Sequence, residues 1–167
     1  MLGFYENFPS YVHRTERFLT SRISNRKLQQ AIIQALHEIN GETFTFEEVA
    51  KPTIPKCTIM FEFGIADGDG FNYLDSEETN RVLEFIRKRP LQLVDFLCIV
   101  KYYKDGGERK TPLKFDYYMI RIIFGEKLME TNVFHEKGLR HIFPEDIISL
   151  IVERVNKSFS RSVLKKA

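Results

Sequence analysis

The sequence lacks the motifs that mark the common nucleotide-binding enzymes and hydrolases. Neither a Walker loop nor a G-x-G-x-x-G segment is present, so the glycine-rich backbone that usually cradles phosphate groups is missing. The G-x-S-x-G turn that exposes a nucleophilic serine is missing too. We therefore expect a non-catalytic protein, with catalysis by carboxylate side chains as the alternative.

Cysteine is scarce, and tryptophan is absent. Cys57 and Cys98 both sit inside apolar runs, where cysteine usually acts as a small buried hydrophobic residue. A disulfide between them would need matching backbone geometry. Neither residue begins a predicted helix, so neither has the setting of a reactive thiol.

Long apolar runs are absent as well. A transmembrane helix needs about 18 or more consecutive apolar residues, and no run in the chain approaches this length. The first twenty residues are aromatic and charged, unlike a secretory signal peptide. We therefore expect a cytoplasmic protein that does not bind membranes.

The sequence does contain enough apolar material for a core. Its 167 residues are 43% apolar and 29% charged, and they include 15 Phe and 7 Tyr. A chain of this length and composition can bury a core without metals or disulfides. We expect a single domain over residues 1–167, with a short helical segment within residues 1–22 and a basic tail at 160–167.

The net charge of +2 conceals a strong segregation of charge. Residues 1–30 carry five Lys and Arg against two acids, and residues 101–167 carry fourteen against nine. The middle of the chain, residues 31–100, carries six basic side chains against twelve acidic ones. A fold that separates these regions would present one positive face.

Hydrophobic periodicity predicts an α+β fold. Helical spacing of apolar residues predicts helices over residues 9–19, 24–41, 75–89 and 144–162. Alternation of apolar and polar residues predicts strands that begin near residues 43, 57, 93, 113 and 128. We expect a mostly antiparallel sheet of about five to six strands, with helices on one face and a long amphipathic helix near the C-terminus.

Capping residues mark the predicted helix ends. Ser24 can cap the second helix, and Gly41 suits its end. Asp75 can accept from the amide of Glu78 while Glu78 reaches back, as in a capping box. Pro144 marks the start of the last helix.

The segment LKFDYYMIRIIF changes its pattern in the middle. Apolar residues occupy odd positions up to Tyr117 and even positions from Ile120 onward. One extra residue near Tyr117 and Tyr118, in a β-bulge, would let both halves bury the same face. The alternative is a strand whose second half is covered on both faces.

The acidic stretch from Phe61 to Glu78 resembles a metal-binding loop in composition only. With Asp67 and Asp69 at the first two ligand positions of a calcium loop, the next ligand and the required glycine are replaced by Phe71 and Asn72. An Asp-Gly pair between strands instead predicts a hairpin turn over residues 67–70. We therefore expect no metal and no cofactor, and keep a carboxylate enzyme using Glu62, Asp67 and Asp69 as an alternative.

The four histidines also lack the spacing of a metal site. His13, His37, His135 and His141 are not placed four apart on a helix or two apart on a strand. An acid–base role would require a carboxylate partner, which the sequence does not identify.

Two basic segments are the candidate binding residues. The first contains Arg14, Arg17, Arg22, Arg26 and Lys27, of which the first three are the candidate site residues. The second contains Lys101, Tyr102, Tyr103, Lys104, Arg109, Lys110 and Lys114, in which aromatic rings could stack on bases while basic side chains pair with phosphates. A smaller group, Lys137, Arg140 and His141, precedes the last helix, although Glu145 and Asp146 already occupy its start.

Three functions follow from these patterns. The first hypothesis is a binding or regulatory module that meets nucleic acid or an acidic protein through a basic face. The second is a small hydrophobic ligand held between the sheet and the C-terminal helix. The third is the carboxylate enzyme. An exposed apolar sheet face would additionally favour a homodimer.

Overall fold

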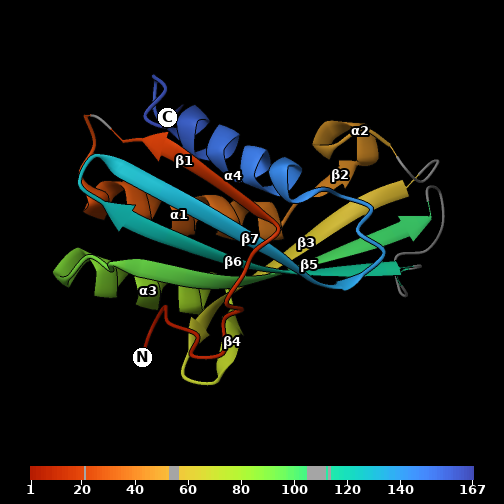
Figure 1. Cartoon of the computed structure of the whole chain (residues 1–167), viewed down its shortest axis with the longest axis horizontal. Coiled ribbons are helices and arrows are strands. Elements are labelled where there is room, and N and C mark those ends of the chain that lie inside the picture. Colours follow the sequence, from red (N-terminus) through yellow and green to blue (C-terminus); the bar gives the residue numbers. More distant parts are fainter. Residues whose placement is uncertain (21, 53–56, 105–111, 113) are drawn as a thin grey trace.

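The computed structural model describes residues 1–20, 22–52, 57–104, 112 and 114–167 (Figure 1). The described residues form four helices and eight strands. The helices are α1 (Asn25–Asn40), α2 (Phe46–Val49), α3 (Ser76–Lys88) and α4 (Pro144–Ser158). The strands are β1 (Arg14–Leu19), β2 (Thr43–Thr45), β3 (Cys57–Asp67), β4 (Gly70–Tyr73), β5 (Leu93–Lys104), β6 (Lys114–Gly125), β7 (Leu128–Gly138) and β8 (Lys165–Lys166).

One sheet holds the strands in the order β2-β3-β5-β6-β7-β1-β8, and β4 pairs with β3 beside this path. Each pairing is antiparallel. The α+β class is therefore confirmed, with more strands than predicted. The additional strands, β1 and β8, come from segments for which the sequence predicted a helix and a tail.

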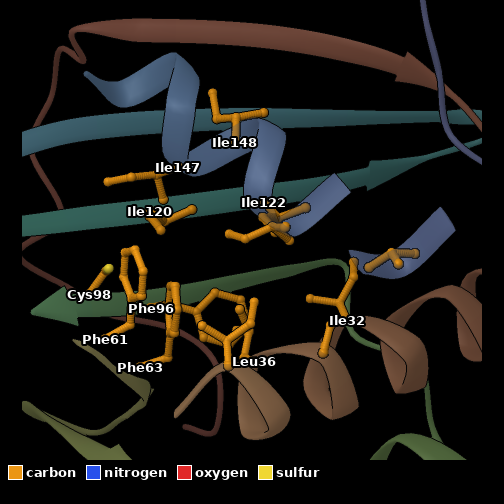
Figure 2. Close-up of a cluster of buried hydrophobic side chains, with 14 of the residues drawn as sticks. Ile32, Leu36, Phe61, Phe63, Phe96, Cys98, Ile120, Ile122, Ile147 and Ile148 are labelled. Atoms are coloured by element: carbon orange, nitrogen blue, oxygen red, sulfur yellow. The ribbon is translucent and has the colours of Figure 1, made fainter. Parts of the chain in front are cut away.

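The inner face of the sheet packs on helices α1 and α4. Figure 2 shows Phe61, Phe63 and Phe96 of the sheet near Leu36 of α1, and Ile147 of α4 beside Ile120 of β6. Each of these side chains is buried. Side chains of the protein thus fill the space between the sheet and α4, which leaves the hydrophobic-ligand alternative without support.

The predicted helix over residues 9–19 is wrong. Residues 14–19 form β1, which pairs with β7 from Arg14 opposite Val133 to Leu19 opposite Leu128. Glu16 and Phe18 are buried while Thr15 and Arg17 are exposed, so the segment also satisfies a period of two. Short apolar runs fit both periods, and here the pairing with β7 decided between them.

The N-terminal residues run across the outer face of the sheet. Gly3 donates its N–H to the carbonyl of Ala66 and accepts from the N–H of Asp95, which places it between β3 and β5. The buried Asp95 carboxylate pairs with Arg121, whose guanidinium also lies 4.4 Å from the ring centre of Phe8. These contacts fix the path that leads into β1.

The segment TFTFEEV changes from strand to helix after three residues. Thr45 ends β2 and caps α2, because its N–H donates to the Glu48 carboxylate at 2.9 Å. This capping box, a Thr-x-x-Glu pattern, was not predicted from the sequence. The alternation of Phe44 and Phe46 concealed it.

The caps of α1 and α3 are confirmed. Ser24 accepts from the N–H of Lys27 at 3.2 Å, and Asp75 accepts from the N–H of Glu78 at 2.8 Å. The Glu78 side chain does not complete the predicted capping box. Its carboxylate instead accepts hydrogen bonds from Asn72 and Arg81.

Helix α4 begins at Pro144 as predicted but has only 15 residues, so it is not clearly long. It ends at Ser158, and Ile147, Ile148, Ile151 and Val155 form its buried stripe. The residues that follow α4 turn back toward β1.

A β-bulge lies where the sequence predicted one, but in a different strand. The β6–β7 register shifts between Tyr117 and Tyr118, whereas β6 pairs with β5 without interruption. Tyr117 pairs with Lys137 and Tyr118 with His135, so the extra residue is Glu136 of β7. Strand β6 buries its even-numbered side chains from Asp116 to Phe124. The odd-numbered aromatic residues Phe115 and Tyr117 lie on the other face.

The turn over residues 67–70 is confirmed as a hairpin. Asp67 pairs with Gly70, and Gly68 has a φ of +67° at the first central position, which type II′ turns usually fill with glycine. Asp67 forms an ion pair with Arg81 at 2.9 Å. The cation beside this acidic turn is therefore the Arg81 side chain.

The two cysteines are buried in adjacent strands. Cys98 pairs in register with Phe63, and Cys57 pairs with Lys104 at the far end of the same ladder, so no disulfide joins them. Within the described residues, no helix is both long and apolar enough to cross a membrane.

Candidate anion-binding site

The two predicted basic segments do not meet. Arg17 lies in register with Glu130, and through Ile123 with Leu93, at the beginning of β5. Lys101 is eight residues further along β5, which corresponds to about 26 Å at the rise of a strand. The first segment therefore lies toward one end of the sheet and the second toward the other.

Several of the predicted cations are neutralised by acids. Arg17 pairs with Glu130 at 2.9 Å, and Lys101 pairs with Glu62. Arg14 lies 3.4 Å from Glu16 and 3.7 Å from Glu145. Glu62, from the carboxylate alternative, is thus also engaged with a cation.

The predicted stacking residues are unavailable to a ligand. Tyr102 is fully buried and Tyr103 is 6% exposed. The Tyr102 hydroxyl donates to Asp116 at 2.6 Å, and burial raises the pKa of Tyr102 well above its ordinary value. Base stacking on these rings is excluded.

Two of the remaining residues of the second segment lie at the same end of the sheet, because Lys114 pairs in register with Tyr102, two residues before Lys104. Lys104 and Lys114 are exposed at the end of β5 and the start of β6. Arg109 and Lys110 lie outside the described residues.

The structure brings together a third group of basic side chains, which the sequence did not predict as one site. Arg22, from the first basic segment, lies beside Arg161, Ser162 and Lys165 of the C-terminal tail. These four residues line a surface hollow of about 420 Å³, which we call the cationic hollow. None of the four is acidic, so the lining carries three positive charges.

Hydrogen bonds to the side chain of one asparagine hold the tail in this position. Asn156 of α4 accepts hydrogen bonds from the N–H groups of Val163 and Leu164, both at 2.9 Å, and donates to the carbonyl of Leu164. Val163 and Leu164 are themselves buried. The chain therefore folds back, and β8 adds to β1 with Lys165 opposite Leu19.

Arg22 enters from the other side of the hollow. Its φ of +73° turns the chain between β1 and α1, and its carbonyl accepts a hydrogen bond of 3.0 Å from the Arg161 guanidinium. Figure 1 shows the C-terminus near the end of β1, where this contact forms. Segments from both ends of the sequence thus build one site.

The hollow has an uncompensated positive potential. Among the ion pairs between described residues, none includes Arg22, Arg161 or Lys165. Helix α1 begins close by and has no acidic residue in its first turn, unlike α3 and α4. The amides of its first turn add to the potential.

The sequence contained a signal for this arrangement. Val163 and Leu164 form an apolar pair inside the basic tail, and apolar residues in an exposed tail have no partner to pack on. Their presence indicates that the tail returns to the core. Lys165 and Arg161 then take positions on either side of the buried pair.

The described residues contain no group of three or more His, Cys, Asp or Glu side chains arranged to hold a metal ion. Comparisons with protein-family models, with curated proteins and with solved structures found no match to this chain.

Proposed function

We propose that the protein is a binding module that holds the phosphate backbone of a nucleic acid in the cationic hollow. The observation that supports this is the convergence of Arg22, Arg161 and Lys165 around a hollow with no acidic lining residue. Arg and Lys are the side chains that most often contact phosphate oxygens. The basic-face hypothesis thus applies to a different set of residues than the sequence indicated.

The chemistry favours contacts with the backbone rather than with bases. Tyr102 and Tyr103 are buried, and the residues that line the hollow include no aromatic ring. Without a stacking surface, single-stranded and duplex nucleic acids should bind with similar affinity per phosphate.

Fluorescence anisotropy with labelled 20-nucleotide RNA and duplex DNA tests the proposal. Three phosphate contacts predict a slope of roughly −2 to −3 for the logarithm of the binding constant against the logarithm of salt concentration. Arg161→Gln/Lys165→Gln should flatten this slope and weaken binding strongly. The matched control is Arg87→Gln/Lys88→Gln, which removes the same charge from α3, where Glu84 already pairs with both residues.

Two results would overturn the proposal. One is the absence of binding at low salt. The other is an equal loss of binding in the control variant, which would show that binding depends only on the net charge of the protein. Poly-L-glutamate at the same charge concentration serves as a competitor, and displacement more effective than that by unlabelled RNA would assign the hollow to acidic proteins.

A further inference from the structure

The opposite end of α4 holds a second pocket, beside a loop that is anchored on a buried carboxylate. Asp116 has no exposed surface and accepts four hydrogen bonds. Its donors are the Tyr102 hydroxyl at 2.6 Å, His135 Nε2 at 2.8 Å and the backbone N–H groups of Arg140 and His141 at 2.7 and 3.0 Å. A carboxylate with this many donors is a fixed anchor for the loop that leads into α4.

The loop wraps closely around Asp116. Gly138 has a φ of +109°, and a Cβ atom there would lie 2.4 Å from the Asp116 carboxylate, so only glycine fits. Two residues later Arg140 also takes a left-handed conformation, with a φ of +57°. Its N–H is directed at Asp116 while its side chain remains exposed. The Arg140 guanidinium lies over the ring of Phe143, 5.7 Å from its centre.

His13 is held in one tautomer on the other wall of the pocket. Its Nδ1 accepts a hydrogen bond of 2.9 Å from the backbone N–H of His135, and its ring stacks on Phe134 at 4.8 Å. A backbone N–H can only donate, so Nδ1 carries no proton. The neutral ring then has its proton on Nε2, which makes His13 a hydrogen-bond donor toward any ligand.

These groups line a surface pocket of about 370 Å³, which we call the His13–Arg140 pocket. Its walls are His13, Arg14, Arg140, Phe143, Pro144 and Glu145. Three of these side chains are donors, and Glu145 is the single acceptor side chain. With neutral histidine the lining has a net charge of +1, because Arg14 and Arg140 outweigh Glu145.

We propose that the His13–Arg140 pocket binds a small carboxylic acid that also carries an ammonium or hydroxyl group. The carboxylate takes the donors of Arg140 and His13, and the ammonium or hydroxyl group donates to Glu145. One carboxylate matches the two donors, whereas a phosphate dianion would be repelled by Glu145 and by Asp146 in the same first turn of α4. The volume falls in the range of small-molecule sites.

This pocket is separate from the cationic hollow. The two lie at opposite ends of α4, about 22 Å apart along its 15 residues. The small-molecule site therefore goes beyond the proposed nucleic-acid binding, and each can fail without the other.

Isothermal titration calorimetry with L-serine, L-lactate, acetate and inorganic phosphate at constant ionic strength tests the proposal. L-Serine and L-lactate should bind more tightly than acetate, and phosphate most weakly. Arg140→Asn should weaken L-serine binding by about tenfold or more, since it removes a charged hydrogen bond. Asparagine tolerates the left-handed backbone, and the N–H bond to Asp116 stays in place.

The matched control is Arg17→Gln, which removes an arginine of β1 whose partner, Glu130, is outside the pocket. It should change L-serine binding less than twofold. Phosphate binding as tight as that of L-serine, no heat with any of the four probes, or an equal loss in the control would each overturn the proposal. Long-range ¹H–¹⁵N NMR adds an independent check, because a proton on His13 Nδ1 in the ligand-free protein would also contradict it.

Discussion

Charged side chains at the two ends of α4 lie in opposite environments. At its C-terminal end, Arg22, Arg161 and Lys165 are exposed and lack an acidic partner among the described residues. At its N-terminal end, Asp116 is fully buried and accepts four hydrogen bonds. Water can satisfy an exposed cation, but a buried carboxylate needs donors from the protein.

This difference separates residues for binding from residues for stability. Changing an exposed, unpaired cation alters the surface potential and little else. Changing Asp116 leaves a hydroxyl, an imidazole and two backbone N–H groups without their acceptor. The same charge change should therefore have large effects on folding at one end of α4 and small effects at the other.

The largest expected effect is that of Asp116→Ala. We expect it to lower the free energy of unfolding by about 3 to 5 kcal/mol, because it strands several buried donors. Urea denaturation followed by circular dichroism measures this. Asp69→Asn in the exposed β3–β4 turn is the control and should stay within about 0.5 kcal/mol of the wild type. A similar loss in both variants would contradict the contrast between buried and exposed charge.

Alkaline pH should destabilise the same end of the molecule. Burial raises the pKa of Tyr102 and Tyr118 above 10.0 in the folded protein, whereas the unfolded tyrosines keep ordinary values. A raised folded pKa means that the stabilisation is complete below pH 10 and is lost as pH rises above it. Between pH 10 and pH 11 the two residues together should lower the free energy of unfolding by roughly 2 kcal/mol.

The measurement is the urea midpoint at several pH values between 9 and 11. Tyr102→Phe/Tyr118→Phe should reduce the slope by the share of the two tyrosines, whatever its stability at pH 9. The buried Cys98 thiol, whose pKa burial also raises, should account for part of the slope that remains. Tyr11→Phe, at a tyrosine that is 65% exposed, should leave the slope unchanged. A slope as steep in the double variant as in the wild type would contradict the prediction.

The smallest of the three effects concerns the tail. Asn156→Ala removes the acceptor for the N–H groups of Val163 and Leu164, and should cost about 1 to 2 kcal/mol. It should also weaken nucleic-acid binding, because Arg161 and Lys165 lose their fixed positions. Lys157→Ala, in the same helical turn, is the control for stability. Intact binding by Asn156→Ala would mean that the hollow does not depend on the folded-back tail.

Much of the local structure could be predicted because its causes are local. Ser24 and Asp75 cap their helices through hydrogen bonds that span three residues, so the pattern is visible in a short window. The alternating faces of β3 and β5 follow in the same way from neighbouring residues. The bulge was predicted at the correct place but assigned to β6, since the pattern of one strand does not show which partner carries the extra residue.

The candidate sites could not be predicted, because their residues are far apart in the chain. Among the residues proposed from sequence, Arg22 and Arg14 line surface hollows, while Tyr102 serves the core. A segment of interleaved tyrosines and lysines has the same sequence pattern whether its rings are exposed or buried. The position of β5 in the middle of the sheet decided that Tyr102 is buried.

The sequence by itself determined the α+β class, the helix ends and the faces of the central strands, since those depend on bonds and side-chain spacing within a few residues. Tertiary structure alone decided that residues 14–19 form a strand, that the tail returns to β1, and that Arg22 meets Arg161 across 139 positions of sequence. Those outcomes depend on strand register and on the burial of Val163 and Leu164. Both are long-range interactions, whose free energy exists only when distant segments are already in contact.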